Sequence, residues 1–260
     1  MAYKKEDASA AGLFVRQIAL REALPPDHYV AALPVTRHLS RRPIAFTAPV
    51  TFFVGENGAG KSTLIEALAI AMGFNPEGGS KNFNFSTENS HSSLHEYLRV
   101  SRGPHRPRDG FFLRAESFYN VASSIDQMDR EGGLGAPVIN SYGGVSLHRQ
   151  SHGESFLSLV ENRFGGSGLY ILDEPEAALS PIGILRLMYN MHALEMDHSQ
   201  FIISTHSPLL MAYPGAQILE ITPEEIRPVP WQEAEHVRIT REFLAAPDRM
   251  LRQMWDGQDC

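Results

Sequence analysis

The segment Gly55-Glu56-Asn57-Gly58-Ala59-Gly60-Lys61-Ser62 fits the pattern G-x-x-x-x-G-K-[ST] and constrains the fold more than any other feature. An apolar run at 51–54 precedes it and predicts a buried strand. Apolar residues at helical spacing follow over 61–72. In such a turn, backbone N–H groups can wrap an anion, and the helix N-terminus adds partial positive charge. The context favours a phosphate-binding loop over a glycine-rich turn that only starts a helix.

The residue types in this loop predict ATP and Mg²⁺ as its ligands. Lys61 would reach the β- and γ-phosphates, Ser62 would bind Mg²⁺ through its hydroxyl, and Thr63 would contact the α-phosphate. The residues expected to bind the nucleotide are Gly55, Glu56, Asn57, Gly58, Ala59, Gly60, Lys61, Ser62 and Thr63.

Two acids follow the apolar run at 169–172, which predicts a second buried strand. Acids at the carboxyl end of a parallel strand are expected close to the phosphate loop. Asp173 is then a candidate Mg²⁺ ligand, and Glu174 a candidate base for the attacking water. The alternative is a helix N-terminus that happens to favour acids.

The rest of the chain alternates between strand and helix patterns. Strands are predicted at 13–20, 44–46, 111–113, 201–204 and 217–221, and helices within 92–100 and at 156–164, 182–195 and 231–254, the last broken at Pro247. This alternation predicts an α/β fold with a largely parallel sheet covered by helices. We expect one domain over 1–260, with a polar, mobile leader at 1–11 and insertions at 75–110 and 119–150.

Two further motifs follow the order of the ATP-binding-cassette superfamily. Ser151-His152-Gly153-Glu154 lies 22 residues before Asp173, and His206 lies 33 residues after it. The chain therefore resembles that superfamily. The resemblance implies that Ser151, Gly153 and Glu154 cap the γ-phosphate of ATP bound to a second subunit, and that His206 contacts the γ-phosphate in its own subunit. It also implies an ATP-dependent head-to-tail homodimer in which Glu174, His206 and Lys61 are catalytic.

Over about 12–252 the chain also looks like small stand-alone bacterial ATPases of the AAA-21 type. The stretches that carry this resemblance are 78–83, 90–97, 111–118, 151–154, 173–181 and 205–208. It implies a P-loop fold with a mostly parallel sheet flanked by helices, an antiparallel N-terminal β portion and a helical insertion.

The sequence departs from that of the transporter ATPases at three points. Glu116 or Ser117 stands where they carry a glutamine after the next strand, so Glu116 becomes a candidate metal ligand. The signature reads Ser-His-Gly-Glu rather than Ser-Gly-Gly-Gln, and Leu179-Ser180-Pro181 lacks their usual acid, as in the soluble repair-type branch. Only 90 residues separate Lys61 from Ser151, which is too short for a long coiled-coil arm.

Composition excludes several other classes of protein. Lys plus Arg is 23 and Asp plus Glu is 30, so the net charge of −7 argues against a general nucleic-acid coat. The single cysteine, Cys260, excludes an internal disulfide and a multi-cysteine zinc site. No apolar run approaches the ~18 residues of a membrane helix. We expect a cytoplasmic protein without a membrane segment.

Basic clusters leave the choice of partner open. Five arginines could meet nucleic acid, an acidic protein or the triphosphate, or could form a solvated loop: Arg99, Arg102, Arg106, Arg108 and Arg114. Tyr29, or an arginine at 37, 41 or 42, could stack on adenine. The function predicted is Mg²⁺-dependent ATP hydrolysis that drives dimer closure and opening on an unidentified protein or nucleic-acid partner. The alternatives are a nucleotide-gated binding module without turnover and the ATPase subunit of a transporter.

Overall fold

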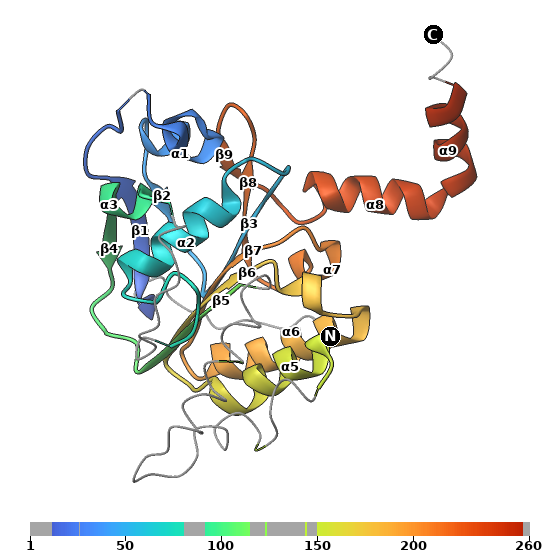
Figure 1. The fold of residues 1–260 in the computed structure, drawn as a ribbon. Coiled ribbons are helices and arrows are strands. Elements are labelled where there is room, and N and C mark those ends of the chain that lie inside the picture. The colour runs from blue at the N-terminus through green and yellow to red at the C-terminus, as the bar shows by residue number, and fades with distance from the viewer. Residues whose placement is uncertain are drawn as a thin grey trace.

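The computed structural model describes residues 12–25, 27–80, 92–114, 123, 144 and 150–256. Its centre is a six-stranded sheet in the order β5-β6-β7-β3-β8-β9 (Figure 1). The strands are β3 (Val50–Gly55), β5 (Asp109–Arg114), β6 (Gly168–Asp173), β7 (Gln200–Ser204), β8 (Gln217–Ile221) and β9 (Ile226–Pro228). All neighbouring pairs are parallel except β8 and β9. The predicted α/β fold with a mostly parallel sheet is therefore confirmed.

Helices cover both faces of this sheet. Helix α2 (Lys61–Ala71) packs on one face, and helices α5 (His152–Arg163) and α6 (Pro181–Met196) pack on the other (Figure 1). Every residue of β3, β6 and β7 is buried as a result. Strands buried on both faces read as continuous apolar runs, which is why the sequence pattern found them.

A second, antiparallel sheet in the order β2-β1-β4 lies beside α2. It consists of β1 (Val15–Leu20), β2 (Ile44–Ala45) and β4 (Leu98–Arg102), and it confirms the N-terminal antiparallel portion. The short helix expected within 92–100 is α3 (Leu94–Tyr97), and the chain then turns directly into β4. Part of the segment expected as an insertion, 75–110, thus belongs to this sheet.

Shorter elements and the C-terminal helices complete the fold. They are η2 (Tyr29–Ala32), α1 (Pro34–Leu39), η5 (Pro175–Ala178), α7 (Pro208–Met211), α8 (Glu235–Ala245) and α9 (Pro247–Asp256). The predicted helix break at Pro247 is confirmed. Helix α8 leads away from the body and α9 continues from its far end (Figure 1), with no buried residue in α9. Within the described part of the chain, no helix is long and apolar enough to cross a membrane.

Some predictions concern residues that the structure does not describe. The leader at 1–11, Glu116 and nearly all of 119–150 lie outside the described residues. The expected division of the chain, one domain over 1–260 with these insertions, stays a prediction.

Candidate functional site

The phosphate loop joins β3 to α2, as the motif requires. Gly55 and Gly60 have φ angles of 141° and 91°, in the region that favours glycine. A Cβ atom at Gly60 would lie 2.6 Å from Val35 Cγ1, and one at Gly55 would lie 2.5 Å from the carbonyl oxygen of Ile221. Both positions require glycine, because α1 and β8 lie so close to the loop that a Cβ atom would not fit.

Lys61 is held inside this loop. The residue is only 4% exposed, and Nζ donates to the carbonyl oxygens of Gly55 at 2.8 Å and Glu56 at 2.9 Å. Burial lowers the pKa of Lys61, although the charges of Glu174 and Asp173 oppose this shift. The ammonium group thus sits at the loop where a phosphate would need a counter-charge.

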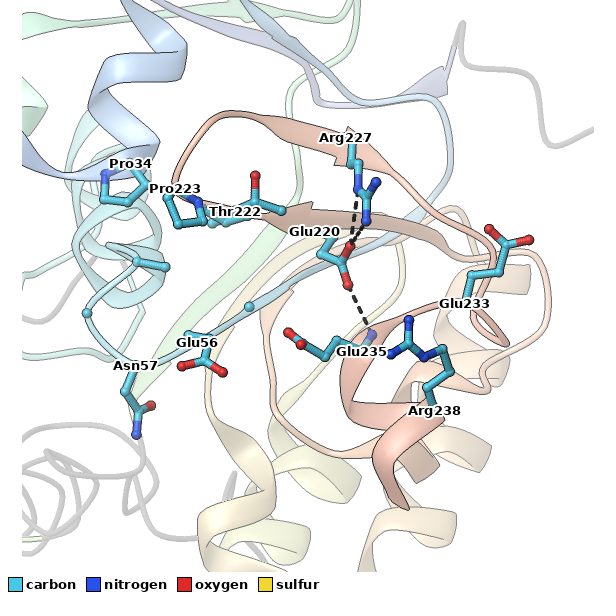
Figure 2. Close-up of a pocket in the computed structure, with 14 residues that line it drawn as sticks. Pro34, Glu56, Asn57, Glu220, Thr222, Pro223, Arg227, Glu233, Glu235 and Arg238 are labelled. Carbon is cyan, nitrogen blue, oxygen red and sulfur yellow. Dashed lines mark hydrogen bonds and ion pairs between the residues drawn. The ribbon is translucent and has the colours of Figure 1, made fainter. Parts of the chain in front are cut away.

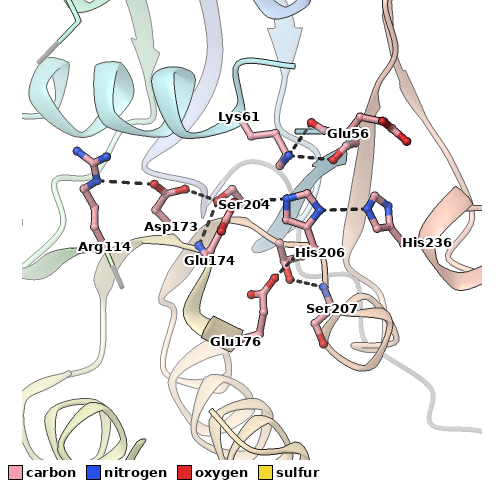
Figure 3. Close-up of polar contacts among 12 residues, drawn as sticks. Glu56, Lys61, Arg114, Asp173, Glu174, Glu176, Ser204, His206, Ser207 and His236 are labelled. Atoms are coloured by element: carbon pink, nitrogen blue, oxygen red, sulfur yellow. Dashed lines mark hydrogen bonds and ion pairs between the residues drawn. The ribbon is translucent and has the colours of Figure 1, made fainter. Parts of the chain in front are cut away.

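Asp173 ends β6 among hydroxyl and guanidinium groups (Figure 3). Ser204 Oγ donates to Asp173 Oδ1 at 2.5 Å, and the Ser62 side chain also hydrogen-bonds the carboxylate. Arg114 Nε lies 3.7 Å from Oδ2. Burial raises the pKa of Asp173, against the effects of these neighbours. Although β7 lies between β6 and β3, the structure brings Ser62 and Asp173 together.

This donor set suits Mg²⁺ better than a transition metal. A hydroxyl and a carboxylate are hard oxygen ligands, and Mg²⁺ usually takes one or two such groups together with phosphate oxygens and waters. Among the described residues, no group of three His, Cys, Asp or Glu side chains could hold a metal on its own. Glu116, the third candidate ligand, lies outside the described residues.

Glu174 has an unusual backbone next to Asp173. Its φ and ψ of 50° and 53° lie in the left-handed region, which costs a non-glycine residue roughly 1–2 kcal/mol. Its N–H donates to the carbonyl oxygen of Ser204 at 3.1 Å. The side chain is 39% exposed, and Oε1 lies 3.4 Å from His206 Nε2. The turn therefore points the carboxylate toward His206 rather than along the strand.

His206 follows β7 and is held at both its backbone and its ring (Figure 3). Its N–H donates to Glu176 Oε1 at 2.5 Å, and its Nδ1 lies 3.0 Å from His236 Nε2. Burial and the nearby charge of Lys61 lower the pKa of His206. Sequence reasoning missed both Glu176 and His236. Glu176 lies two residues past Glu174, but His236 is 30 residues from His206 and carries no local signal.

The signature residues lie at the start of α5, where Ser151 is the N-cap. The Glu154 N–H donates to Ser151 Oγ at 3.3 Å, and the Ser151 N–H donates to Glu154 Oε2 at 3.0 Å. Hydrogen bonds from Ser151 lower the pKa of the exposed Glu154. A Cβ atom at Gly153 would lie 2.9 Å from the carbonyl oxygen of Ala178. This capping box accounts for the serine and the glutamate by itself, so their predicted role toward a second subunit stays a prediction.

The five arginines of the basic cluster do not share one role. Arg114 belongs to the site, where Nη1 donates to Glu66 Oε2 at 2.6 Å. Arg102 donates to the carbonyl oxygen of Ala71 at 3.1 Å, while Arg106 and Arg108 are exposed. Of the residues suggested for adenine, Arg42 pairs with Glu225 and Tyr29 stacks on His28. Neither arrangement tests the suggestion.

A cleft of about 590 Å³ lies beside the phosphate loop, between it and the first turn of α8 (Figure 2). Glu220, which is buried near the end of β8, lines this cleft and is held by hydrogen bonds. Arg227 donates to its Oε2 from Nε at 3.2 Å and from Nη2 at 2.8 Å, and the Glu235 N–H donates to its Oε1 at 3.0 Å. The start of α8 is thereby fixed close to the loop.

Family models and solved structures both include matches to this chain. Residues 37–113 match a family described as "AAA domain", and residues 146–212 match one described as "AAA domain, putative AbiEii toxin, Type IV TA system". No curated protein matches the chain. Among solved structures, the SMC head domain from Thermotoga maritima is 17% identical, covering 84% of this chain and 99% of that one, with a TM-score of 0.43. A structure titled "An inward-facing conformation of a putative metal-chelate type ABC transporter" is 16% identical, covering 74% and 76%, with a TM-score of 0.44.

The two family matches contain residues that the geometry brings together. The first contains the phosphate loop, and the second contains Asp173, Glu174 and His206. Both segments that build the candidate site therefore match AAA-domain models, each of which covers less than half of the chain.

Proposed function

We propose that this chain binds ATP with Mg²⁺ at 55–63 and hydrolyses it to ADP and phosphate. The proposal depends on one observation. Four side chains lie close together at the carboxyl ends of the strands: Lys61, Asp173, Glu174 and His206. These groups come from three different strand ends. Their convergence supplies a cation for the phosphates, an acid for a metal and a carboxylate that can accept a proton.

The residues divide the chemistry between them. Lys61 moves its hydrogen bonds from the loop carbonyls to the β- and γ-phosphates. Ser62 and Asp173 would hold Mg²⁺, which would supply positive charge to the phosphate oxygens. Glu174 accepts a proton from water as the water oxygen bonds to the γ-phosphorus. The bond from that phosphorus to the bridging oxygen breaks, and ADP leaves. His206 donates a hydrogen bond to the γ-phosphate.

ATP binding closes two copies head to tail in this proposal. Ser151, Gly153 and Glu154 of one copy would cap the γ-phosphate in the other, since the N–H groups of a helix start favour an anion. Closure excludes water from the site, and hydrolysis reopens the dimer on its protein or nucleic-acid partner.

The test compares wild type with Glu174→Gln, which keeps the size of the side chain but removes the proton acceptor. We expect kcat to fall by about 10²- to 10⁴-fold because a positioned base is lost. ATP binding should persist, and light scattering should detect a dimer with ATP and Mg²⁺. An equal ATPase rate would refute the role of Glu174. A variant that stays monomeric with saturating ATP would refute closure alone.

A nucleotide-gated binding module without turnover gives a different result. Wild type would then bind ATP and change its oligomeric state, yet release no phosphate with or without DNA or RNA. Such a result would overturn hydrolysis and leave nucleotide binding in place.

A further inference from the structure

We propose that His236, in the first turn of α8, positions His206 by fixing which of its ring nitrogens carries the proton. The inference rests on the proposed hydrolysis, in which His206 faces the γ-phosphate. His236 Nε2 lies 3.0 Å from His206 Nδ1. The two ring centroids are 5.0 Å apart and the ring planes cross at 64°, so the rings meet edge to face (Figure 3).

A hydrogen bond between two neutral imidazoles needs one N–H donor and one bare nitrogen. If His236 Nε2 donates, His206 Nδ1 accepts and the proton of His206 lies on Nε2. That nitrogen faces Glu174 Oε1 at 3.4 Å, and an ionised carboxylate can only accept. In the opposite arrangement, a bare nitrogen would face the carboxylate. The surroundings therefore favour His236 as the donor and the Nε2–H form of His206.

The same form is the one that hydrolysis needs. A neutral His206 can donate to a phosphate oxygen only from a protonated Nε2, because Nδ1 is occupied by His236. A doubly protonated ring would also donate from Nε2. Burial and the charge of Lys61 disfavour that ring by lowering the pKa of His206.

The backbone on either side of His236 is firmly held. Ala234 and Val237 are buried, with 0% and 4% exposure, and the Glu235 N–H donates to the clamped carboxylate of Glu220 at 3.0 Å. Beyond Val237 the helix is exposed and leads away from the body (Figure 1). His236 thus stands on the one part of α8 that is anchored beside the phosphate loop.

Nuclear magnetic resonance on full-length, ¹⁵N-histidine-labelled protein without nucleotide tests the proton position directly. The signals of His206 are identified by their loss in His206→Gln. We expect the Nε2–H form in wild type and in His236→Gln, whose amide N–H can replace the imidazole donor. His236→Leu removes the donor, and the signals should shift toward a mixture of both forms. An Nδ1–H form in wild type, or an unchanged form in His236→Leu, would overturn the inference.

Kinetics add a second readout. Loss of the partner that orients a metal-ligating histidine typically costs about 10- to 100-fold, and we expect kcat of His236→Leu to fall by a similar factor with little change in KM for ATP. His236→Gln should recover most of the rate. Thr240→Ala, at an exposed position one turn further along α8, is the matched control and should equal wild type.

The two proposals fail in different ways. If wild type hydrolyses ATP and His236→Leu keeps its kcat, the role of His236 is wrong and the proposed function stands. If wild type does not hydrolyse ATP, the proposed function fails, and the resonance experiment alone decides whether His236 sets the proton on His206.

Discussion

An acidic side chain lies in a network of polar groups at each end of strand β6, and the two networks differ. At its amino end, Tyr170 Oη donates to Asp109 Oδ2 at 2.8 Å, and Arg163 Nη1 donates to Asp109 Oδ1 at 2.8 Å. The Gly165 N–H adds a third donor at 2.9 Å. At the carboxyl end, the carboxylate of Asp173 has two hydroxyl donors. Among the described residues, the nearest positively charged side chain is that of Arg114, whose Nε lies 3.7 Å from Asp173 Oδ2.

The charge balance at the two ends is opposite. Burial disfavours the charged form of Asp109, yet the hydrogen bond and charge of Arg163 hold its pKa below the usual value. At Asp173, burial outweighs the hydrogen bond from Ser204 and the charge of Arg114, so the pKa is raised. The amino end is satisfied by the protein alone. At the carboxyl end the cost of burying the charge of Asp173 is not fully offset by its neighbours, which suits its proposed role toward Mg²⁺.

Asp173→Asn should have the largest effect and should distinguish the two ends of β6 most clearly. We expect the ATPase rate to fall by about 10²-fold or more, since the ligand proposed for Mg²⁺ is lost. Without nucleotide, the variant should unfold at the same or a higher temperature than wild type, because a buried charge is removed. ATPase assays and calorimetry measure the two effects. A lowered melting temperature would contradict the contrast between the ends.

Asp109→Asn should have the reverse pattern. The change removes the negative charge that faces Arg163 Nη1 at 2.8 Å, so we expect a loss of about 3 kcal/mol in the free energy of unfolding. ATP affinity should change little, because Asp109 lies at the opposite end of β6 from the phosphate loop. Urea titration measures the loss, and a stability equal to wild type would show that the amino end is not held by this pair.

The pH dependence of stability should have opposite signs at the two acids. Asp109 has a lowered folded pKa, so its stabilisation is present above the ordinary value of 3.8 and is lost as the pH falls through the folded pKa. Asp173 has a raised folded pKa, so its charged form begins to destabilise the fold as the pH rises above 3.8. Urea titrations of wild type and both asparagine variants across this range measure each contribution. If stability depended on pH in the same way in wild type and in both variants, the opposite pKa shifts of Asp109 and Asp173 would be refuted.

Tyr170→Phe tests the hydroxyl at the amino end. The Tyr170 Oη donates to Asp109 Oδ2 and accepts from the Gly165 N–H, so its loss should cost about 1–2 kcal/mol. The ring itself stays packed between Phe164 and Phe201. Equilibrium unfolding measures the change, and a loss as large as that of Asp109→Asn would mean that packing, not the hydroxyl, is disturbed.

Arg186→Ala should have the smallest effect. Arg186 pairs with Glu161 at 2.7 Å between α6 and α5, but the two side chains are 54% and 34% exposed. Water screens such pairs, so we expect a change of at most about 0.5 kcal/mol in urea titration. A larger loss would mean that exposed pairs, too, hold the helices on this face.

Features that depend on neighbours in sequence were predictable. The loop at 55–62, the runs that form β3, β6 and β7, and the acids at 173 and 174 each carry their signal within a few residues. Even so, the pattern of the signature did not distinguish an N-terminal capping box from a site for a second subunit, because both use serine and glutamate at the start of a helix.

Features that depend on distant partners were not predictable. Strand β9 has only three residues, one of them a proline, and exists because it pairs with β8. Helix α1 begins at Pro34 in a proline-rich segment that looks irregular, although proline suits the first turn of a helix. His236 joins the site because Glu220 and the buried Ala234 and Val237 anchor the start of the helix that carries it.

The left-handed backbone of Glu174 has an evolutionary consequence. Glycine or asparagine adopts that conformation with less strain than glutamate. Mutation of Glu174 to either residue is therefore expected to stabilise the fold. A lineage released from selection for hydrolysis would drift in that direction. Among relatives that keep the phosphate loop, the residue at this one position should then separate those that turn over nucleotide from those that only bind it.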